Sequence, residues 1–155
     1  MNSGDTSVPE NPFVGVWKLV SCEAARASGN AMPVYGKNPV GRLYYDASGN
    51  MSVHIMRAGR TPFKRDTKFR AAQEEMRSAY ESYEAYFSNY VVDPVKQQIH
   101  HTVIGGLFPN WEGSVQSRFY EFRGNDRLIL STAPIGARPD GEPIITLVWE
   151  RISRG

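Results

Sequence analysis

The sequence predicts an all-β protein: an eight-stranded antiparallel up-and-down barrel with one amphipathic helix over its open mouth. Three observations lead to this fold class. Apolar and β-branched runs recur along most of the 155 residues, and short turns rich in Gly, Asn, Asp or Pro separate most of them. One segment alone carries apolar residues at three- and four-residue spacing, which is typical of a helix. Because short links join antiparallel neighbours, eight such strands can close and leave an interior for one small ligand.

The composition is that of a single globular domain. A length of 155 residues with 41% hydrophobic and 22% charged residues is ordinary for one domain. The formal net charge of +2 is too small to gather nucleic acid, and no apolar run approaches the roughly 20 residues that span a bilayer. We expect residues 1–12 to be a flexible tail and residues 13–155 to be the barrel domain. The polar start lacks a secretory pattern, which favours a cytoplasmic location.

The first strand is expected at 14–23, where Val16 and Val20 belong to an apolar run without helical spacing. The lone Cys22 lies within this run and is interpreted as an inert buried thiol. A Gly-, Pro- and Asn-rich connection follows at 24–38. It leads into a hairpin.

The hairpin is expected from strands at 40–46 and 50–57. Gly49 and Asn50 suit the left-handed positions of the short turn between them. These strands would lie next to the first one in the barrel.

A helix is expected over 68–85, with Asp66 or Thr67 capping its first turn. Its aromatic stripe needs an apolar partner, and the open barrel mouth would supply one. The apolar residues at helical spacing are Phe69, Ala72, Met76, Ala79, Tyr80, Tyr83, Tyr86 and Phe87.

Five more strands complete the barrel. Turn sequences containing Asp93-Pro94 and Gly124-Asn125 divide four of them into two hairpins. The five strands are expected at 86–92, 97–104, 114–122, 127–133 and 144–152.

Several motifs resemble a known family. Gly15-Val16-Trp17 resembles the Gly-x-Trp signature of the lipocalin superfamily, in which the Trp plugs the closed barrel end and a basic residue of the last strand packs across it. Arg151, in the last expected strand, corresponds to this basic residue. The more specific motifs are Pro39-Val40-Gly41-Arg42-Leu43-Tyr44-Tyr45, Gly49-Asn50-Met51-Ser52 with Met56-Arg57, and His100-His101 followed by Leu107-Phe108-Pro109-Asn110-Trp111.

Together these motifs are similar to the bacterial and fungal lipocalin-like domain family over roughly residues 13–152. The resemblance implies a compact barrel with a ligand cavity. It does not imply one reaction, because such families include carriers, enzymes of secondary metabolism and proteins of no known role.

The three histidines are the first candidate site residues. His100 and His101 are adjacent and point to opposite faces of a regular strand, so they do not readily chelate one ion. We predict no metal and no cofactor. His101 shares its face with Ile99 and Val103 and is expected to point inward, either as a hydrogen-bonded core residue or as a general acid–base. His100 takes that role if the register is shifted, and His54 is a candidate ligand contact whose direction stays open.

Two arginines and the aromatic residues complete the candidate site. Arg57 and Arg118 have apolar neighbours and, pointing inward, would suit an enolate, carboxylate or phenolate; the alternative is an outward ion pair. The loop 105–111 is interpreted equally as a gate or a packed plug. The aromatic residues expected to contact the ligand are Tyr83, Tyr86, Tyr90, Phe108, Trp111 and Tyr120.

Three functions remain open. The first is a cofactor-independent isomerase, cyclase or lyase of secondary metabolism that acts on a hydrophobic, polyketide- or terpenoid-type small molecule. In it His101 moves a proton while Arg118 or Arg57 stabilises negative charge. The second is a carrier of the same ligand without turnover. The third is an interaction module that uses the basic stretch 57–70, and a homodimer is left open.

Overall fold

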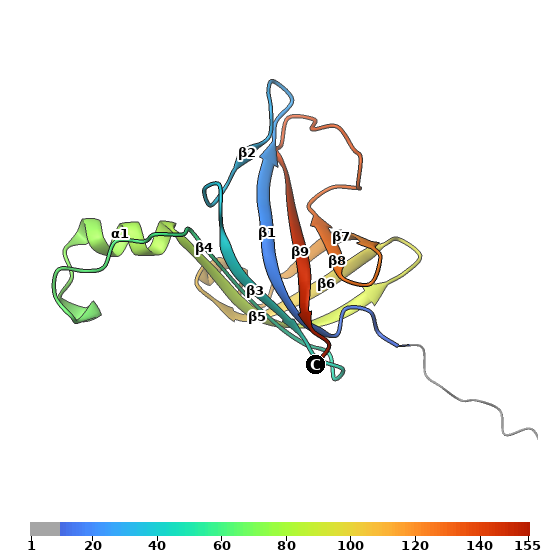
Figure 1. Cartoon of the computed structure of the whole chain (residues 1–155), viewed down its shortest axis with the longest axis horizontal. Helices are drawn as coiled ribbons and strands as arrows, with labels where there is room; N and C mark the ends of the chain where they lie inside the picture. The colour runs from blue at the N-terminus through green and yellow to red at the C-terminus, as the bar shows by residue number, and fades with distance from the viewer. Residues whose placement is uncertain (1–9) are drawn as a thin grey trace, which may run out of the picture.

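The computed structural model describes residues 10–155, whose strands form one antiparallel sheet that closes where β1 pairs with β9 (Figure 1). The strands are β1 (Gly15–Ala25), β2 (Met32–Pro33), β3 (Val40–Tyr45), β4 (Asn50–Met56), β5 (Tyr83–Asp93), β6 (Gln98–Gly106), β7 (Val115–Arg123), β8 (Arg127–Ser131) and β9 (Ile144–Ser153). The two-residue β2 pairs with the end of β1 at Glu23 and Ala24. The other eight strands make the barrel wall. The predicted eight-stranded antiparallel barrel is confirmed.

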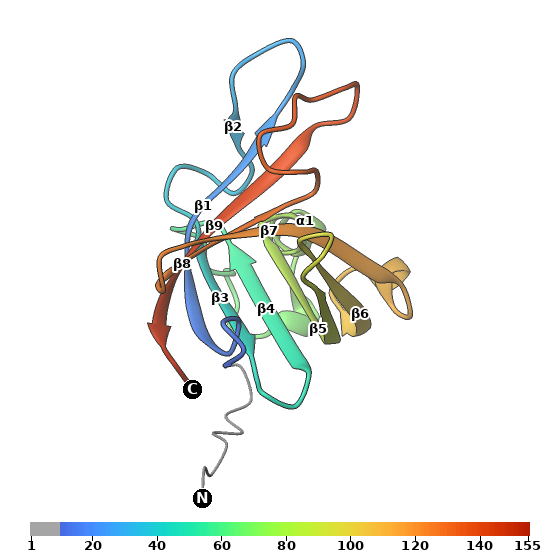
Figure 2. The same cartoon turned by 90° about the vertical axis from the view of Figure 1, so that its right-hand side faces the viewer.

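Figure 2 shows β3, β4, β5 and β6 side by side in the barrel wall. Alternation along such strands decides which side chains enter the barrel. In β3 and β4, buried and more exposed residues alternate, and Leu43, Tyr45, Met51, Val53 and Ile55 point inward. This is the period-two pattern of a sheet with one covered face. The core is therefore the barrel interior.

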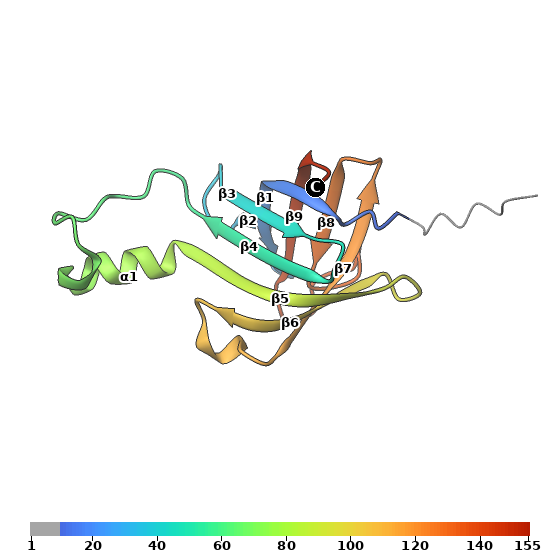
Figure 3. The same ribbon diagram turned by 90° about the horizontal axis from the view of Figure 1, so that it is seen from below.

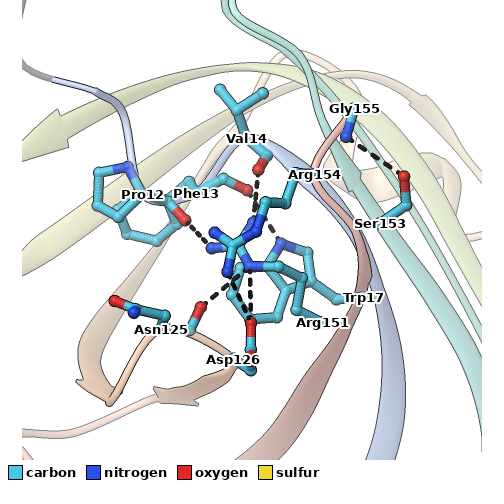
Figure 4. A network of polar contacts seen from close by, with 10 residues as sticks. All are labelled: Pro12, Phe13, Val14, Trp17, Asn125, Asp126, Arg151, Ser153, Arg154 and Gly155. Atoms are coloured by element: carbon cyan, nitrogen blue, oxygen red, sulfur yellow. Dashed lines mark hydrogen bonds and ion pairs between the residues drawn. The ribbon is translucent and has the colours of Figure 1, made fainter.

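One barrel end is closed by Trp17 and Arg151, as predicted (Figure 4). The Trp17 side chain is fully buried and its Nε1 donates to the Phe13 carbonyl over 2.9 Å. The Arg151 guanidinium covers the indole, with Cζ 4.2 Å from the ring centroid. It also donates to the carbonyls of Val14 and Pro12 over 2.7 and 2.8 Å. The guanidinium thus joins the first and last strands.

The helix differs from the prediction in length and in place. The expected 68–85 segment is divided into a 3-10 turn η1 (Lys68–Arg70) and a nine-residue helix α1 (Gln73–Glu81). Neither has a buried residue, and α1 extends away from the barrel instead of lying over its mouth (Figures 1 and 3). The helix ends early because Tyr83 already pairs with Met56 in the sheet. Among residues 10–155, no helix is long and apolar enough to cross a membrane.

The predicted helix cap is also wrong. The residue before α1 is Ala72, and Thr67 precedes η1 without a side-chain hydrogen bond. The carboxylate of Glu75 instead accepts from the Ala72 N–H over 3.2 Å and from the Lys64 N–H over 2.8 Å. It thereby satisfies the N–H of the residue before the helix and joins the loop at Lys64 to the first turn.

The expected 1–12 tail lies mostly outside the described residues, which begin at residue 10. Two of its last residues are already attached to the barrel. Asn11 donates to the Tyr90 hydroxyl over 3.0 Å, and the Pro12 carbonyl accepts from Arg151.

Candidate ligand cavity and hydrogen-bond chain

The barrel interior contains a cavity of about 130 Å³. This is below the roughly 300–1,000 Å³ of sites for drug-sized ligands, and close to an engineered cavity of about 150 Å³ that binds benzene. It suits a one-ring ligand. Its walls are mostly apolar, and the lining residues are Cys22, Val34, Tyr35, Leu43, Met51, Val53, Ile55, Glu84, Tyr86, His101, Trp111, Arg118, Leu130, Ile145, Leu147 and Trp149.

A hydrogen-bonded chain of three side chains lies at this wall: His101 and Tyr86 line the cavity, and Tyr45 lies behind His101. His101 of β6 is 1% exposed, so the prediction that it points inward is confirmed. Its Nε2 lies 2.8 Å from the hydroxyl of Tyr45, and its Nδ1 lies 3.2 Å from the hydroxyl of Tyr86. Both ring nitrogens therefore have a hydroxyl partner, Tyr45 of β3 at Nε2 and Tyr86 of β5 at Nδ1.

The direction of the hydrogen bonds is assigned from the places of the two tyrosines: Tyr45 is buried and does not line the cavity, whereas Tyr86 does. Burial raises the pKa of Tyr45 well above its usual value, so the phenol keeps its proton. A buried O–H needs an acceptor, and His101 Nε2 lies within reach of it. We assign Tyr45 as the donor, which leaves the imidazole proton on Nδ1, donating to the Tyr86 oxygen. The Tyr86 O–H is then free to donate into the cavity.

The imidazole stays neutral. Burial lowers the pKa of His101 to about 3, and the neighbouring Arg118 and His100 lower it further. A neutral ring has one donor and one acceptor nitrogen, as the chain requires. With so low a pKa, the imidazole is a weak proton acceptor at neutral pH. Its contribution is to hold and polarise Tyr86.

Two charged residues border the same cavity. Arg118 of β7 is partly buried, and its Nη1 donates to the Ser117 carbonyl over 2.8 Å. Glu84 of β5 is also partly buried, and burial raises the pKa of its carboxyl. Glu84 and Tyr86 are two residues apart on one strand, so their side chains share the inner face about 7 Å apart.

The rim of the cavity includes an aromatic residue of the 105–111 loop. Trp111 ends the 3-10 turn η2 (Pro109–Trp111), lines the cavity and packs edge-on against Tyr86 with ring centroids 5.6 Å apart. Phe108 packs on Trp111 from outside and does not line the cavity.

Three expected ligand contacts point outward. His54 is exposed, and its Nδ1 lies 3.0 Å from the hydroxyl of Tyr83 on the outer face. His100 bonds to Ser117 Oγ over 2.7 Å, also outside. The expectation that these three residues line the cavity is wrong, because strand parity turns them away from it.

Two further expected contacts lie at the closed end. Tyr90 donates to the Asp46 carbonyl over 2.6 Å. Tyr120 packs edge-on against Phe13 with ring centroids 4.9 Å apart. Both point inward, but neither lines the cavity, because they are packed beneath it.

Arg57 lies at the end of β4 and is exposed, with its Nη2 3.4 Å from the Val34 carbonyl. It is therefore outside the cavity, whereas Arg118 borders it. The rest of the basic stretch belongs to the segment that projects with α1. There the Arg60 guanidinium lies 5.1 Å from the Tyr83 ring centroid.

No group of three or more metal-ligating side chains occurs within the described part of the chain. His100 and His101 point to opposite faces, as strand parity predicts.

Sequence reasoning missed several residues of the site, among them Glu84 and Tyr35, which line the cavity, and Tyr45, which bonds to His101. Tyr45 shares its face with Leu43, which alternation along the strand could have shown. Glu84 falls within the helix expected over 68–85, and correct placement of the helix end would have assigned it to a strand that faces the cavity. Tyr35 lies in a loop after β2, where no periodicity indicates direction; burial raises its pKa to about 12.

Comparison with known proteins agrees with this architecture. No curated protein matches the chain significantly. The model of a family described as lipocalin-like domain matches residues 14–152, which include all barrel strands and the whole cavity lining. The chain therefore belongs to the lipocalin-like domain family, whose barrel is consistent with small-molecule binding.

Proposed function

We propose that the protein binds a compact, mostly apolar carbonyl compound in the barrel cavity and isomerises it by proton transfer without a cofactor. The observation that supports this most directly is the Tyr45–His101–Tyr86 chain, which leaves one phenol proton free at the wall of an apolar cavity. Such a preorganised donor stabilises an oxygen that becomes negative in the transition state.

The proposed step is a 1,3-proton shift in a carbonyl compound that has a β,γ carbon–carbon double bond. The Glu84 carboxylate removes a proton from the carbon next to the carbonyl, and the C–H electron pair moves to form the enolate. Tyr86 donates a hydrogen bond to the enolate oxygen, and Arg118 stabilises its charge. The Glu84 carboxyl then returns the proton to the γ carbon, so the carbon–carbon double bond moves and no redox partner is needed.

The geometry favours this division of roles. Glu84 and Tyr86 are about 7 Å apart along β5, and a reacting group fits between two side chains that each approach it to about 3–3.5 Å. Burial raises the pKa of Glu84, which makes it a stronger base than an exposed carboxylate. His101 holds the Tyr86 oxygen in place.

A carrier without turnover is the second candidate. One observation favours it: both nitrogens of His101 are occupied by protein hydroxyls, as in a histidine that only orders a binding site. A carrier would bind the same ligand and leave its C–H bonds untouched.

The test uses 3-cyclohexen-1-one, a one-ring ketone whose isomerisation to 2-cyclohexen-1-one produces a conjugated absorbance. We expect the wild-type protein to accelerate this conversion, and the product to carry deuterium at the γ carbon in D₂O where the Glu84 carboxyl exchanges its proton with solvent. Glu84→Gln and Tyr86→Phe should each lower the rate about 10²–10⁴-fold. Tyr83→Phe, on the outer face, is the matched control.

Binding of the ketone without conversion by the wild-type protein would identify a carrier. Equal rates for wild type and Glu84→Gln would remove Glu84 as the base.

A further inference from the structure

Residues 57–82, which we call the arm, project from the barrel wall. The arm joins the end of β4 to the start of β5 and includes η1 and α1 (Figure 3). Met56 and Tyr83, the residues on either side of it, pair with each other in the sheet. Glu84, which follows Tyr83, lines the cavity, whereas Trp17 lies at the closed end of the barrel. The arm therefore leaves the barrel at the cavity end.

The first half of the arm, residues 57–70, is a cationic surface. It carries six basic residues against one acidic residue, Asp66. All six basic residues are exposed, and none of them has an ion-pair partner within residues 10–155. The six are Arg57, Arg60, Lys64, Arg65, Lys68 and Arg70. Their positive charge is available to an anionic partner.

The acidic side chains of α1 leave this charge in place. The Glu75 carboxylate accepts from the backbone N–H groups of Lys64 and Ala72. Glu81 pairs with Arg77 of the same helix over 2.9 Å. Two of the acidic groups of α1 are thus used inside the arm, and neither pairs with a basic side chain of 57–70.

A large apolar side chain lies within the cationic surface. Phe69 is 87% exposed, and Lys68 Nζ lies 5.3 Å from its ring centroid. Met76 and Tyr80 of α1 are also exposed, and they share one helix face because they are four residues apart. Apolar side chains held in water among basic ones are typical of segments that lie at the boundary between lipid headgroups and acyl chains.

The apolar residues also favour one kind of anionic partner over another. A nucleic acid would neutralise the basic side chains and would stack a base on Phe69, but it offers no apolar environment to Met76. A lipid surface satisfies both, because headgroups carry the negative charge and acyl chains receive the apolar side chains.

We propose that the arm docks the protein on an anionic lipid surface, with the basic side chains of 57–70 at the headgroups and Phe69 inserted at their boundary with the acyl chains. Docking of this kind brings the cavity end of the barrel to the membrane. The inference goes beyond the proposed function and is independent of ligand binding and turnover, because 57–70 lies outside the cavity lining.

The experiment compares sedimentation of the full-length protein with two kinds of vesicle, phosphatidylcholine alone and phosphatidylcholine mixed with phosphatidylserine. We expect binding to the mixed vesicles, weakened by high salt, which screens the charges. Lys68→Glu should weaken the affinity about 10–30-fold, because each basic residue near an anionic surface contributes several-fold. Lys96→Glu, in the turn at the other end of β5, is the matched control and should bind like wild type.

A second pair of variants tests insertion of the aromatic ring. Phe69→Ser should weaken binding to the mixed vesicles about tenfold, because the apolar contact with lipid is lost. Its control is Val95→Ser, which changes a side chain that is 92% exposed beside Lys96. The near-UV circular dichroism of all four variants should match that of wild type, since each residue is exposed.

Equal binding to both kinds of vesicle, or equal affinities of Lys68→Glu and Lys96→Glu for the mixed vesicles, would overturn the proposal. Binding to a single-stranded RNA without binding to the mixed vesicles would identify a nucleic-acid partner instead. Conversion of the ketone should be unchanged in Lys68→Glu, so this result and that of the proposed function are read separately.

Discussion

Arg151 of the last strand covers the indole of Trp17 in the first strand, with its Cζ 4.2 Å from the ring centroid. The guanidinium also donates to carbonyls of Val14, Pro12 and Asn125. Stacking, stem burial and three hydrogen bonds therefore act together where β1 meets β9. The closed end of the barrel depends on this pair.

Replacing Trp17 by Ala should lower the free energy of unfolding by about 3–5 kcal/mol, because a fully buried indole is lost and a cavity remains. Urea unfolding measures the change. Trp111→Ala, at the partly exposed rim, is the control and should cost much less. A melting temperature within a degree or two of wild type for Trp17→Ala would contradict the assigned role in barrel closure.

Gly15 should not tolerate alanine. Its φ of +136° is unfavourable for residues with a Cβ, and an added Cβ would lie 2.9 Å from Arg151 Nη1. We expect Gly15→Ala to cost about 1–3 kcal/mol in thermal or urea unfolding. The control is Gly29→Ala, where nothing lies within 4 Å of an added Cβ. Equal stability of the two variants would show that the start of β1 adjusts to the added Cβ without a cost in stability.

His101 should make the protein less stable in acid. Its pKa is about 3 in the folded chain and near 6.5 in the unfolded chain. Between these values the unfolded state binds the extra proton, so the free energy of unfolding falls as pH is lowered through this window. Burial is the main cause of this low pKa, and the neighbouring Arg118 and His100 lower it further. The hydroxyls of Tyr45 and Tyr86 face the ring.

The test compares wild type with His101→Gln in urea at pH 6.5 and pH 4.5. Wild type should lose about 2–3 kcal/mol more than the variant over this interval. His100→Gln, which removes an outer imidazole, is the matched control. The same pH dependence in wild type and His101→Gln would mean that the ring is protonated in the folded protein.

The segment that projects with α1 should be cleavable without loss of the barrel. Neither η1 nor α1 has a buried residue, and Phe69 and Tyr80 are 87% and 47% exposed. A nine-residue helix with little packing opens readily. Limited trypsin digestion should cut first among the basic residues of 60–70 while the near-UV circular dichroism of the barrel persists. First cleavage within a barrel strand would contradict this.

The sequence by itself determined the barrel and the inward direction of His101, and the closed end was implied by the resemblance to the lipocalin signature. These properties depend on local rules: side chains alternate along a strand, and short turns make antiparallel neighbours. The pairing of Trp17 with Arg151 also followed, from the motif at the start of β1 and the matching position near the chain end.

Only the tertiary structure decided what surrounds His101 and where the helix goes. Tyr45 is 56 residues away from His101 in sequence, and barrel closure and strand tilt bring their side chains together. The helix end is where two local preferences compete. Pairing of Tyr83 with Met56 ends the helical segment early, turns Glu84 into the cavity and directs α1 away from the mouth. Strand register, a long-range property, therefore chose the polar groups of the site.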